Sequence, residues 1–253
     1  MTQTKPLQGK NVLISGGSRN LGEAVARRMA LLGAGLVINH WQDGEKAEEL
    51  GRSLAAEGHK VTVAEANVSD SAQVTKMVTA ATQSIGPIDI LIHCAGPFAM
   101  TPFTEMTEQE WDTILGVNLK AAYLLAKALS PAMKQRGWGR IILMSAGSAF
   151  IRTHSIYGLA KSSVIHLTES LAVELGPEIT VNAIAPGQIL ESAAIMDSYE
   201  TGFSEKATQA APLKRLVTRS EVAEMMALIC TSPAMQSVTG HTFVMDGGWR
   251  LTA

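Results

Sequence analysis

Short apolar runs and longer amphipathic segments alternate along almost the whole chain. The apolar runs predict strands, which are expected over residues 11–15, 36–39, 61–64, 88–93, 140–144, 180–184 and 241–245. Apolar positions at helical spacing predict helices over 22–32, 45–57, 71–85, 111–129 and 155–175, and a further helix that Ser220 opens. Pro131 is expected to kink or end the long helix, and the stretch from the sixth strand to about Pro212 is expected to be irregular.

The order of these elements predicts the fold class. Strands that are separated by helices of this length run parallel, because each crossover returns the chain to the same edge of the sheet. The chain is therefore expected to be an α/β protein with a doubly wound, Rossmann-like parallel sheet of about seven strands and helices on both faces. It contains no repeat, low-complexity stretch or linker, so one domain over residues 1–253 is expected.

Composition and charge narrow the range of functions. Hydrophobic residues make up 46% and charged residues 17% of the 253 residues, which is typical of a globular protein. A net charge of -2 gives no electrostatic footprint for nucleic acid or an acidic membrane, and no apolar run approaches the roughly 18 residues of a membrane span. Cys94 and Cys230 lack metal-ligand spacing, so we expect reduced thiols, no metal and a cytoplasmic protein.

A glycine-rich turn separates the first strand from the first helix. Residues 15–22 have the sequence Ser-Gly-Gly-Ser-Arg-Asn-Leu-Gly. Glycines allow the backbone to approach the phosphates of a nucleotide, and the free N–H groups at the helix start attract negative charge. The turn therefore predicts a site for a nucleotide pyrophosphate.

The end of the second strand bears on the choice between NAD and NADP. Sites selective for NAD usually place a carboxylate there, where it binds the ribose 2′-hydroxyl and repels a 2′-phosphate. Here the residues are Asn39, His40 and Trp41, and no acid occurs before Asp43. Arg19 in the glycine-rich turn can supply positive charge instead, so NADP is favoured. The alternative is that Arg19 is only a solvated surface charge.

Tyr157 and Lys161 form a candidate acid/base pair. At positions i and i+4 of the helix expected over 155–175, both side chains project from one face. An unperturbed phenol loses its proton at about pH 10, and an adjacent ammonium lowers that pKa because it stabilises the phenolate. The same spacing occurs on many helices by chance, so the interpretation of the pair as acid/base depends on motifs in the rest of the chain.

Further motifs follow one another in a fixed order around this pair. They are Ala95-Gly96 after the fourth strand, Val117-Asn118 in the long helix, Pro186-Gly187 after the sixth strand and Asp246-Gly247-Gly248 near the end. With the glycine-rich turn and the Tyr157/Lys161 pair, they resemble the classical short-chain dehydrogenases/reductases. Within that family the chain looks most like the bacterial 3-oxoacyl-carrier-protein reductase and pteridine reductase branches. The similarity spans nearly the whole chain.

The resemblance implies a dinucleotide-binding catalytic domain that transfers hydride from NADPH to a ketone, or in reverse from an alcohol. Tyr157 would be the general acid or base, and Lys161 would bind the nicotinamide ribose and lower the pKa of Tyr157. Asn118 would hold a water that links Lys161 to solvent, and Ser145 would orient the substrate oxygen. The implied cofactor contacts are Gly16, Ser18, Arg19, Leu21, Gly22, Asn67, Val68, Ala95, Gly96, Tyr157, Lys161, Pro186, Gly187 and Ile189. A homotetramer built through the two long helices and the C-terminal segment is also implied.

Several positions depart from the family pattern. Asn20 replaces a glycine of the phosphate turn, but Asn tolerates a left-handed backbone better than most residues, so the turn is expected to survive. Asn67 stands where an aspartate usually contacts adenine. Residues 93–96, His-Cys-Ala-Gly, replace Asn-Asn-Ala-Gly, so whatever those asparagine side chains stabilise must be stabilised differently.

The serine motif leaves three possibilities open. Counting back from Tyr157, Met144 stands where the family has its serine, and the next two residues are Ser145 and Ala146. A one-residue deletion in the following loop aligns Ser145, which we favour. A strictly kept strand register puts Ala146 in that place and makes Ser148 the substitute. In the third possibility no serine reaches the site.

The substrate and the reaction type can be interpreted in more than one way. The altered serine motif is compatible with a non-catalytic NADP-binding regulator, and a pteridine-like C=N bond is a second possible substrate. His154 stands where enoyl reductases of Tyr-x6-Lys spacing have their distal tyrosine, so the Tyr-x3-Lys pair favours a ketone over an enoyl group. His154 and Arg152 either contact the substrate or are solvated loop residues.

Apolar residues near the expected site suggest a substrate lid. These are residues 97–100 together with Ile195, Met196, Tyr199 and Phe203. The segment at about 188–212 follows a strand of the parallel sheet, and such sheets bind ligands beyond the carboxyl ends of their strands. A mobile lid is therefore favoured over the alternative, which is the apolar face of a short helix packed on the body.

Overall fold

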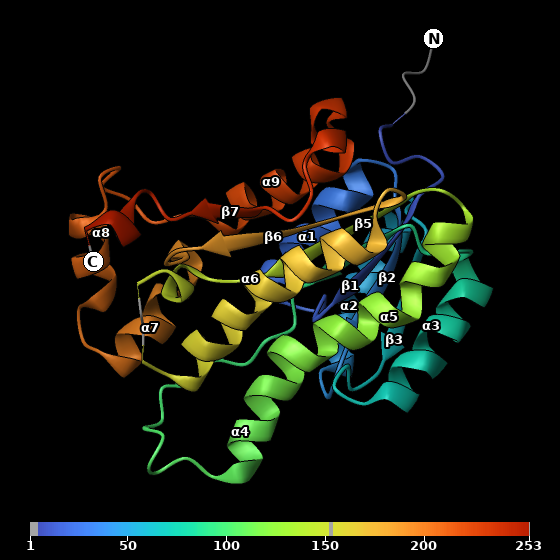
Figure 1. Cartoon of the computed structure of the whole chain (residues 1–253). Helices are drawn as coiled ribbons and strands as arrows, with labels where there is room; N and C mark the ends of the chain where they lie inside the picture. The colour runs from blue at the N-terminus through green and yellow to red at the C-terminus, as the bar shows by residue number, and fades with distance from the viewer. Residues whose placement is uncertain (1–4, 152–153, 253) are drawn as a thin grey trace.

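The chain folds around one parallel sheet whose strands lie in the order β3-β2-β1-β4-β5-β6-β7. The computed structural model describes residues 5–151 and 154–252. In these residues the strands are β1 (Asn11–Ser15), β2 (Gly35–His40), β3 (Val61–Glu65), β4 (Ile90–His93), β5 (Gly139–Met144), β6 (Ile179–Pro186) and β7 (Thr242–Met245). All neighbouring strands pair in parallel, which confirms the expected doubly wound α/β fold (Figure 1).

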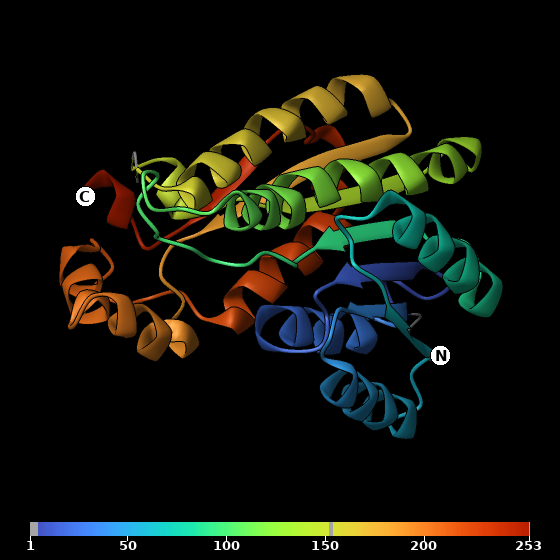
Figure 2. The ribbon, with the colours of Figure 1, turned by 90° about the horizontal axis from the view of Figure 1, so that it is seen from below.

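Helices cover both faces of the sheet. They are α1 (Asn20–Leu31), α2 (Gly44–Ala56), α3 (Ser71–Ile85), α4 (Glu108–Leu115), α5 (Ala121–Gln135), α6 (Ile156–Leu175), α7 (Ala193–Tyr199), α8 (Phe203–Ala210) and α9 (Arg219–Thr231). Residues of α1, α2 and α9 belong to the hydrophobic cluster on one face, and residues of α3, α5 and α6 to the cluster on the other. Figure 2 shows the sheet between these helix layers. Among the described helices, none combines the length and the apolar character that crossing a bilayer requires.

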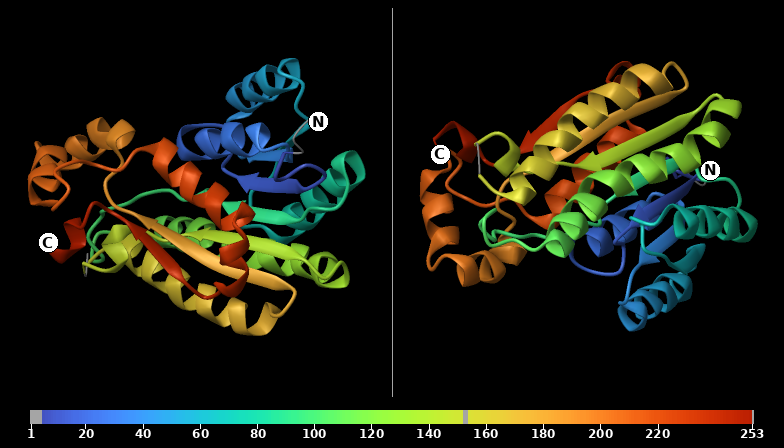
Figure 3. Two further views of the ribbon diagram at one scale, coloured as in Figure 1. Left: turned by 90° about the horizontal axis from the view of Figure 1, so that it is seen from above. Right: turned by 60° about the horizontal axis from the view of Figure 1, so that its bottom comes forward.

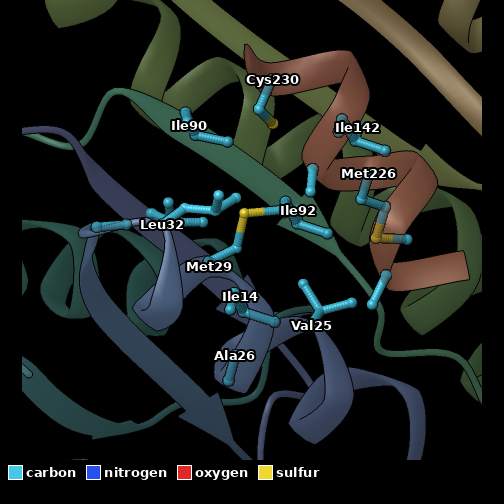
Figure 4. Packing of buried hydrophobic residues seen from close by; sticks show 14 of the residues in the cluster. Ile14, Val25, Ala26, Met29, Leu32, Ile90, Ile92, Ile142, Met226 and Cys230 are labelled. Carbon is cyan, nitrogen blue, oxygen red and sulfur yellow. The ribbon is translucent and has the colours of Figure 1, made fainter. Parts of the chain in front are cut away.

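The central strands each contain an unbroken apolar run because both faces of the sheet are covered. In β1, Val12 and Ile14 belong to one hydrophobic cluster and Leu13 to the other, and all three are fully buried. Figure 4 shows the first cluster, where Met29 of α1 and Met226 of α9 lie over the strands. A strand that alternates between two cores gives an unbroken apolar run, which is why its bounds could be predicted.

The long helix extends beyond the expected residues 111–129 at both ends and contains a π-helical turn. It begins at Glu108, passes through a π-helical turn at Gly116–Lys120 and ends at Gln135, so Pro131 lies inside it rather than at its end. A proline inside a helix removes one backbone hydrogen bond, and the buried residues on either side of it, among them Leu129 and Met133, keep the helix packed on the core. π-Helical turns are frequent at functional sites, and this one contains Asn118.

The segment expected to be irregular contains two short helices. α7 and α8 follow the carboxyl end of β6 and are joined at Gly202, whose φ of 73° lies in the left-handed region that favours glycine. Asp197 accepts hydrogen bonds from the backbone N–H and the hydroxyl of Ser204, at 2.8 and 2.6 Å. Figure 3 shows both helices at one end of the molecule, near the C-terminus. Helices of seven and eight residues give too short a periodic pattern to be found in the sequence.

Candidate active site

Cavity A lies beyond the carboxyl ends of β1 to β4. The strand order changes direction between β1 and β4, and open parallel sheets bind ligands at such a point. The cavity measures about 460 Å³ and is lined by the segments that follow these four strands. The expected cofactor contacts that line it are Gly16, Ser18, Arg19, Leu21, Gly22, Asn67, Val68, Ala95 and Gly96. The described residues hold no cluster of His, Cys, Asp or Glu side chains suited to a metal ion.

The glycine-rich turn brings the backbone of β1 close to that of β4. Gly16 has a φ of 63°, and a Cβ atom there would lie 2.8 Å from the Cα atom of Ala95, so a side chain does not fit. Asn20 has a φ of 53°, which confirms that it takes over the left-handed position of the missing glycine. Arg19 is the N-cap of α1 and, within the described chain, makes no side-chain capping bond. The N–H groups of the first turn are therefore free to bind an anion.

One acidic residue reaches the outer wall of cavity A. Asp43 accepts a hydrogen bond from the hydroxyl of Ser18 at 2.8 Å, and its carboxylate lies 3.6 Å from Nε of Arg19. His40 and Trp41 line the same wall. From the sequence, no acid was expected at the end of β2, and Asp43 was given no role. Its position, three residues after the end of β2, was the available signal.

Cavity B lies next to cavity A and shares Gly96 with it. It measures about 320 Å³ and is lined by Gly96, Phe98, Ala146, Ser148, Tyr157, Pro186, Gly187, Gln188, Ile189, Ser192, Ile195 and Met196. Tyr157 is thus brought together with the expected contacts that follow β6. Phe98 packs edge-on against Tyr157 and Tyr199, with ring centres 4.9 and 5.2 Å apart. Phe203, in contrast, packs against Trp249.

Tyr157 and Lys161 lie on one face of α6, as the sequence predicts. The Nζ atom of Lys161 lies 5.3 Å from the centre of the Tyr157 ring and donates a hydrogen bond to the carbonyl oxygen of Met144 at 2.9 Å. Lys161 is only 4% exposed. The lysine is thus a fixed, buried amine beneath the phenol, held by the end of β5.

Burial shifts both groups of the pair. It raises the pKa of Tyr157 to about 12 and lowers the pKa of Lys161 to about 8. The direction for Tyr157 is opposite to the expected lowering by the ammonium, because a buried phenolate loses its hydration. The phenol is therefore protonated at neutral pH, which suits a proton donor.

Asn118 in the π-helical turn lies near Gly96, as does the amine of Lys161. Its Nδ2 donates to the carbonyl oxygens of Pro97 and Ile114, both at 3.0 Å, and its Oδ1 is buried without a partner among the described residues. A Cβ atom on Gly96 would collide with this oxygen and would lie 3.3 Å from Nζ of Lys161. The oxygen and the amine therefore face the same small space behind Gly96.

Sequence similarity identifies the family. A family model described as enoyl-(acyl carrier protein) reductase matches residues 16–250. The chain is 36% identical over 253 residues to oxidoreductase UcpA of Salmonella typhimurium, covering 96% of this chain and 95% of the relative. It is 31% identical over 245 residues to 3-oxoacyl-(acyl-carrier-protein) reductase of Synechocystis sp., covering 96% and 97%. The chain belongs to the classical short-chain dehydrogenase/reductase family.

Solved structures agree with this assignment. A gluconate 5-dehydrogenase from Burkholderia cenocepacia, in complex with NADP and tartrate, matches with a TM-score of 0.89 and 29% identity. The match covers 99% of each chain, so it extends over both cavities. As a short-chain dehydrogenase/reductase, the protein is an oxidoreductase.

The structure separates the two candidate serines of this short-chain dehydrogenase/reductase. Ser145 is 2% exposed, and its hydroxyl donates to the carbonyl oxygen of Lys161 at 2.9 Å. Contrary to the expectation that favoured it, Ser145 does not belong to the lining of cavity B. Ser148 does line cavity B, beside Ala146, and its buried hydroxyl has no hydrogen-bond partner within the described residues. The pairing of β5 with β6 extends to Ser145, whose N–H donates to the carbonyl oxygen of Ile184.

His93 replaces the first asparagine of the family motif with a different set of bonds. Its Nδ1 lies 2.6 Å from the hydroxyl of Ser15, and its Nε2 lies 3.0 Å from the carbonyl oxygen of Val117. A carbonyl oxygen can only accept, so Nε2 carries the proton and Nδ1 accepts from Ser15. The ring thus connects the end of β1 with the π-helical turn, a role that was not predicted from the sequence.

The loop before α6 contains His154 and Arg152, which were expected either to contact the substrate or to be solvated. His154 is exposed and is not part of the lining of cavity B. Arg152, named with it as a possible substrate contact, lies outside the described residues. Ile195 and Met196 do line cavity B, so the segment after β6 forms one of its walls.

Proposed function

We propose that the protein is an NADPH-dependent oxidoreductase that transfers hydride to a ketone, or from the corresponding alcohol in reverse. The observation that carries the proposal is the position of Tyr157, which lines cavity B with the buried amine of Lys161 beneath it. Cavity B adjoins cavity A at Gly96. A proton donor and a dinucleotide site are therefore next to each other.

The residues of cavity A fit a dinucleotide. The glycine-rich turn and the free first turn of α1 suit the pyrophosphate, with Gly16, Ser18, Arg19, Leu21 and Gly22 as its contacts. Asn67 and Val68 would contact adenine, and Ala95, Gly96, Pro186, Gly187 and Ile189 would line the nicotinamide. NADP is supported by the positive charge of Arg19 and by the gluconate 5-dehydrogenase, whose solved structure contains it. When bound, the reduced nicotinamide supplies the hydride.

Residues of α6 and of the π-helical turn would donate a proton to the substrate and replace it afterwards. Tyr157 donates its hydroxyl proton to the carbonyl oxygen of the substrate, and burial keeps it protonated for that step. Lys161 and Oδ1 of Asn118 face one small space, which suits a water that returns a proton toward Tyr157. Ser148, with its unpartnered hydroxyl among the described residues, would hold the substrate oxygen in place of Ser145.

The lining of cavity B supports an uncharged substrate. Phe98, Ile189, Ile195 and Met196 are apolar, and no Asp, Glu, Lys or Arg belongs to the described lining. A carboxylate or phosphate on the substrate would lose its hydration there without a partner. The segment 188–212 would form the lid over this cavity, because residues at its start and in α7 make one wall.

Turnover with ketones tests the proposal. The purified protein should consume NADPH with uncharged ketones, and Tyr157→Phe should abolish this while NADPH still binds, as measured by quenching of tryptophan fluorescence. Tyr123→Phe is the matched control, because Tyr123 is exposed on α5 and lies outside both cavities. A protein that binds NADPH but reduces no ketone would be the non-catalytic regulator. Reduction of dihydropteridines alone would indicate the C=N alternative.

The assembly is also part of the proposal. Leu159 and Val173 on α6 and Leu251 near the C-terminus are 45%, 87% and 71% exposed. Exposed apolar side chains on a long helix and on the C-terminal segment support a homotetramer built through these parts. Light scattering coupled to size-exclusion chromatography should give four times the 26.9 kDa of one chain.

A further inference from the structure

Asp43 does not play the role that its position suggests. It is the N-cap of α2, where an aspartate normally accepts a hydrogen bond from the first turn of its own helix. Within the described residues it makes no such capping bond. Its carboxylate turns toward the glycine-rich turn instead, where it accepts from the hydroxyl of Ser18 at 2.8 Å and lies 3.6 Å from Nε of Arg19.

The contacts of Asp43 lie on the wall of cavity A that follows β2. Its side chain is 18% exposed, whereas that of Arg19 is 61% exposed. His40 lines the same wall, and its buried Nδ1 has no partner among the described residues. The carboxylate of Asp43 thus already pairs with Arg19, the cation that a cofactor phosphate would need in this part of cavity A.

We infer that Asp43 limits the preference for a phosphorylated dinucleotide and allows NADH to bind as well as NADPH. The inference rests on the proposed function, because it concerns the cofactor of that reaction. A carboxylate accepts a hydrogen bond from a free ribose hydroxyl, and it repels a phosphate that competes for Arg19. Cavity A therefore holds one binding group for each cofactor: the cation of Arg19 for the phosphate, and the carboxylate of Asp43 as acceptor for the hydroxyl.

Binding of the two cofactors tests the inference directly. Dissociation constants for NADPH and NADH are measured by fluorescence titration of the full-length protein. For the wild type we expect the two values to lie within about tenfold of each other, which is a difference of at most about 1.4 kcal/mol. Asp43→Asn keeps an oxygen that accepts from Ser18 and removes the charge, so it should raise the ratio of the NADH constant to the NADPH constant about tenfold.

Two further variants make the result specific. Glu48→Gln removes the same charge from an exposed position of α2 that lines neither cavity A nor the adjoining pocket beside Arg19, and it should leave the ratio unchanged. Arg19→Ala alters an exposed side chain, so it leaves the fold intact, and it should lower the ratio because NADPH loses its cation.

The outcomes separate this inference from the proposed function. A wild type that binds NADPH more than about tenfold tighter than NADH overturns the inference and leaves the proposed function standing. So does an unchanged ratio in Asp43→Asn. A wild type that binds neither cofactor overturns both.

Discussion

Acidification should destabilise the protein through His93. The ring is 1% exposed, accepts from Ser15 through Nδ1 and donates to Val117 through Nε2. It is neutral in this arrangement, because protonation would make Nδ1 a second donor in a site that is closed to solvent. Burial accordingly lowers the pKa of His93 to about 4.

The magnitude follows from the two pKa values. Below about pH 6.5 the imidazole of the unfolded chain takes up a proton, whereas the folded protein does so only near pH 4. The unfolded state therefore binds more protons in this window, so the stability present at neutral pH is lost as the pH falls from 6.5 toward 4. The full difference is about 3 kcal/mol, and at about pH 4.5 most of it is already lost.

The assay is urea unfolding at about pH 7 and about pH 4.5, followed by tryptophan fluorescence. His93→Asn is the comparison variant, because a side-chain amide has both N–H donors and an acceptor oxygen and does not titrate in this range. The wild type should lose about 2 to 3 kcal/mol more than this variant. His166→Asn, at a side chain that is 85% exposed on α6, should lose as much as the wild type. Equal losses in the wild type and in His93→Asn would refute the reasoning.

Three other predictions concern the catalytic groups. Ser148→Ala should lower kcat/KM for ketone reduction about a hundredfold. Ser145→Ala should leave kcat/KM nearly unchanged, and it should lower the free energy of unfolding, measured with urea, by about 1 kcal/mol. Gly96→Ala should reduce turnover strongly, because its Cβ collides with Asn118; circular dichroism should show the fold retained. The Kd of NADPH, titrated across the neutral and alkaline range, should rise above about pH 8 as Lys161 loses its charge, and Lys161→Met should remove this break.

The fold could be predicted because local signals and packing agree. β1 was expected over 11–15 and α3 over 71–85, and the structure gives these bounds. For α3 the ends are set locally: Asp70 accepts from two N–H groups of the first turn, and Gly86 follows the last residue with a φ of 92°. The apolar run of β1 fits because both of its faces are buried. Helix caps and apolar runs of this kind can be recognised in a single sequence.

Other parts of the fold depend on tertiary structure. No residue type in the sequence marks the π-helical turn at Gly116–Lys120 within the long helix. α7 has no buried residue and α8 only Ala207, so neither shows the periodic apolar pattern that marks a packed helix. Pro131 is tolerated because the helix around it is packed on the core, and the rule that proline ends a helix is local.

The candidate site shows the same division. The glycine-rich turn, the Tyr157/Lys161 pair and the left-handed Asn20 could be predicted, because each depends on neighbours in the chain. The choice between Ser145 and Ser148 could not, because it depends on which way a side chain points at the end of β5. Asp43 was missed for a related reason, since its interaction with Arg19 joins two loops that follow different strands.

On the proposed function, burial holds Tyr157 in the protonated form that ketone reduction requires at neutral pH. A phenol with a pKa of about 12 holds a proton that a developing alkoxide can take, whereas alcohol oxidation needs the phenolate, which burial disfavours. Lys161 with a pKa of about 8 remains mostly charged below that pH, and it lies 5.3 Å from the ring centre that must bear the negative charge once the proton leaves. Burial thus keeps the proton on Tyr157 before the transfer. The ammonium of Lys161 stabilises the phenolate after it. The proposed role of Lys161 is therefore to stabilise the Tyr157 phenolate until the phenol is protonated again.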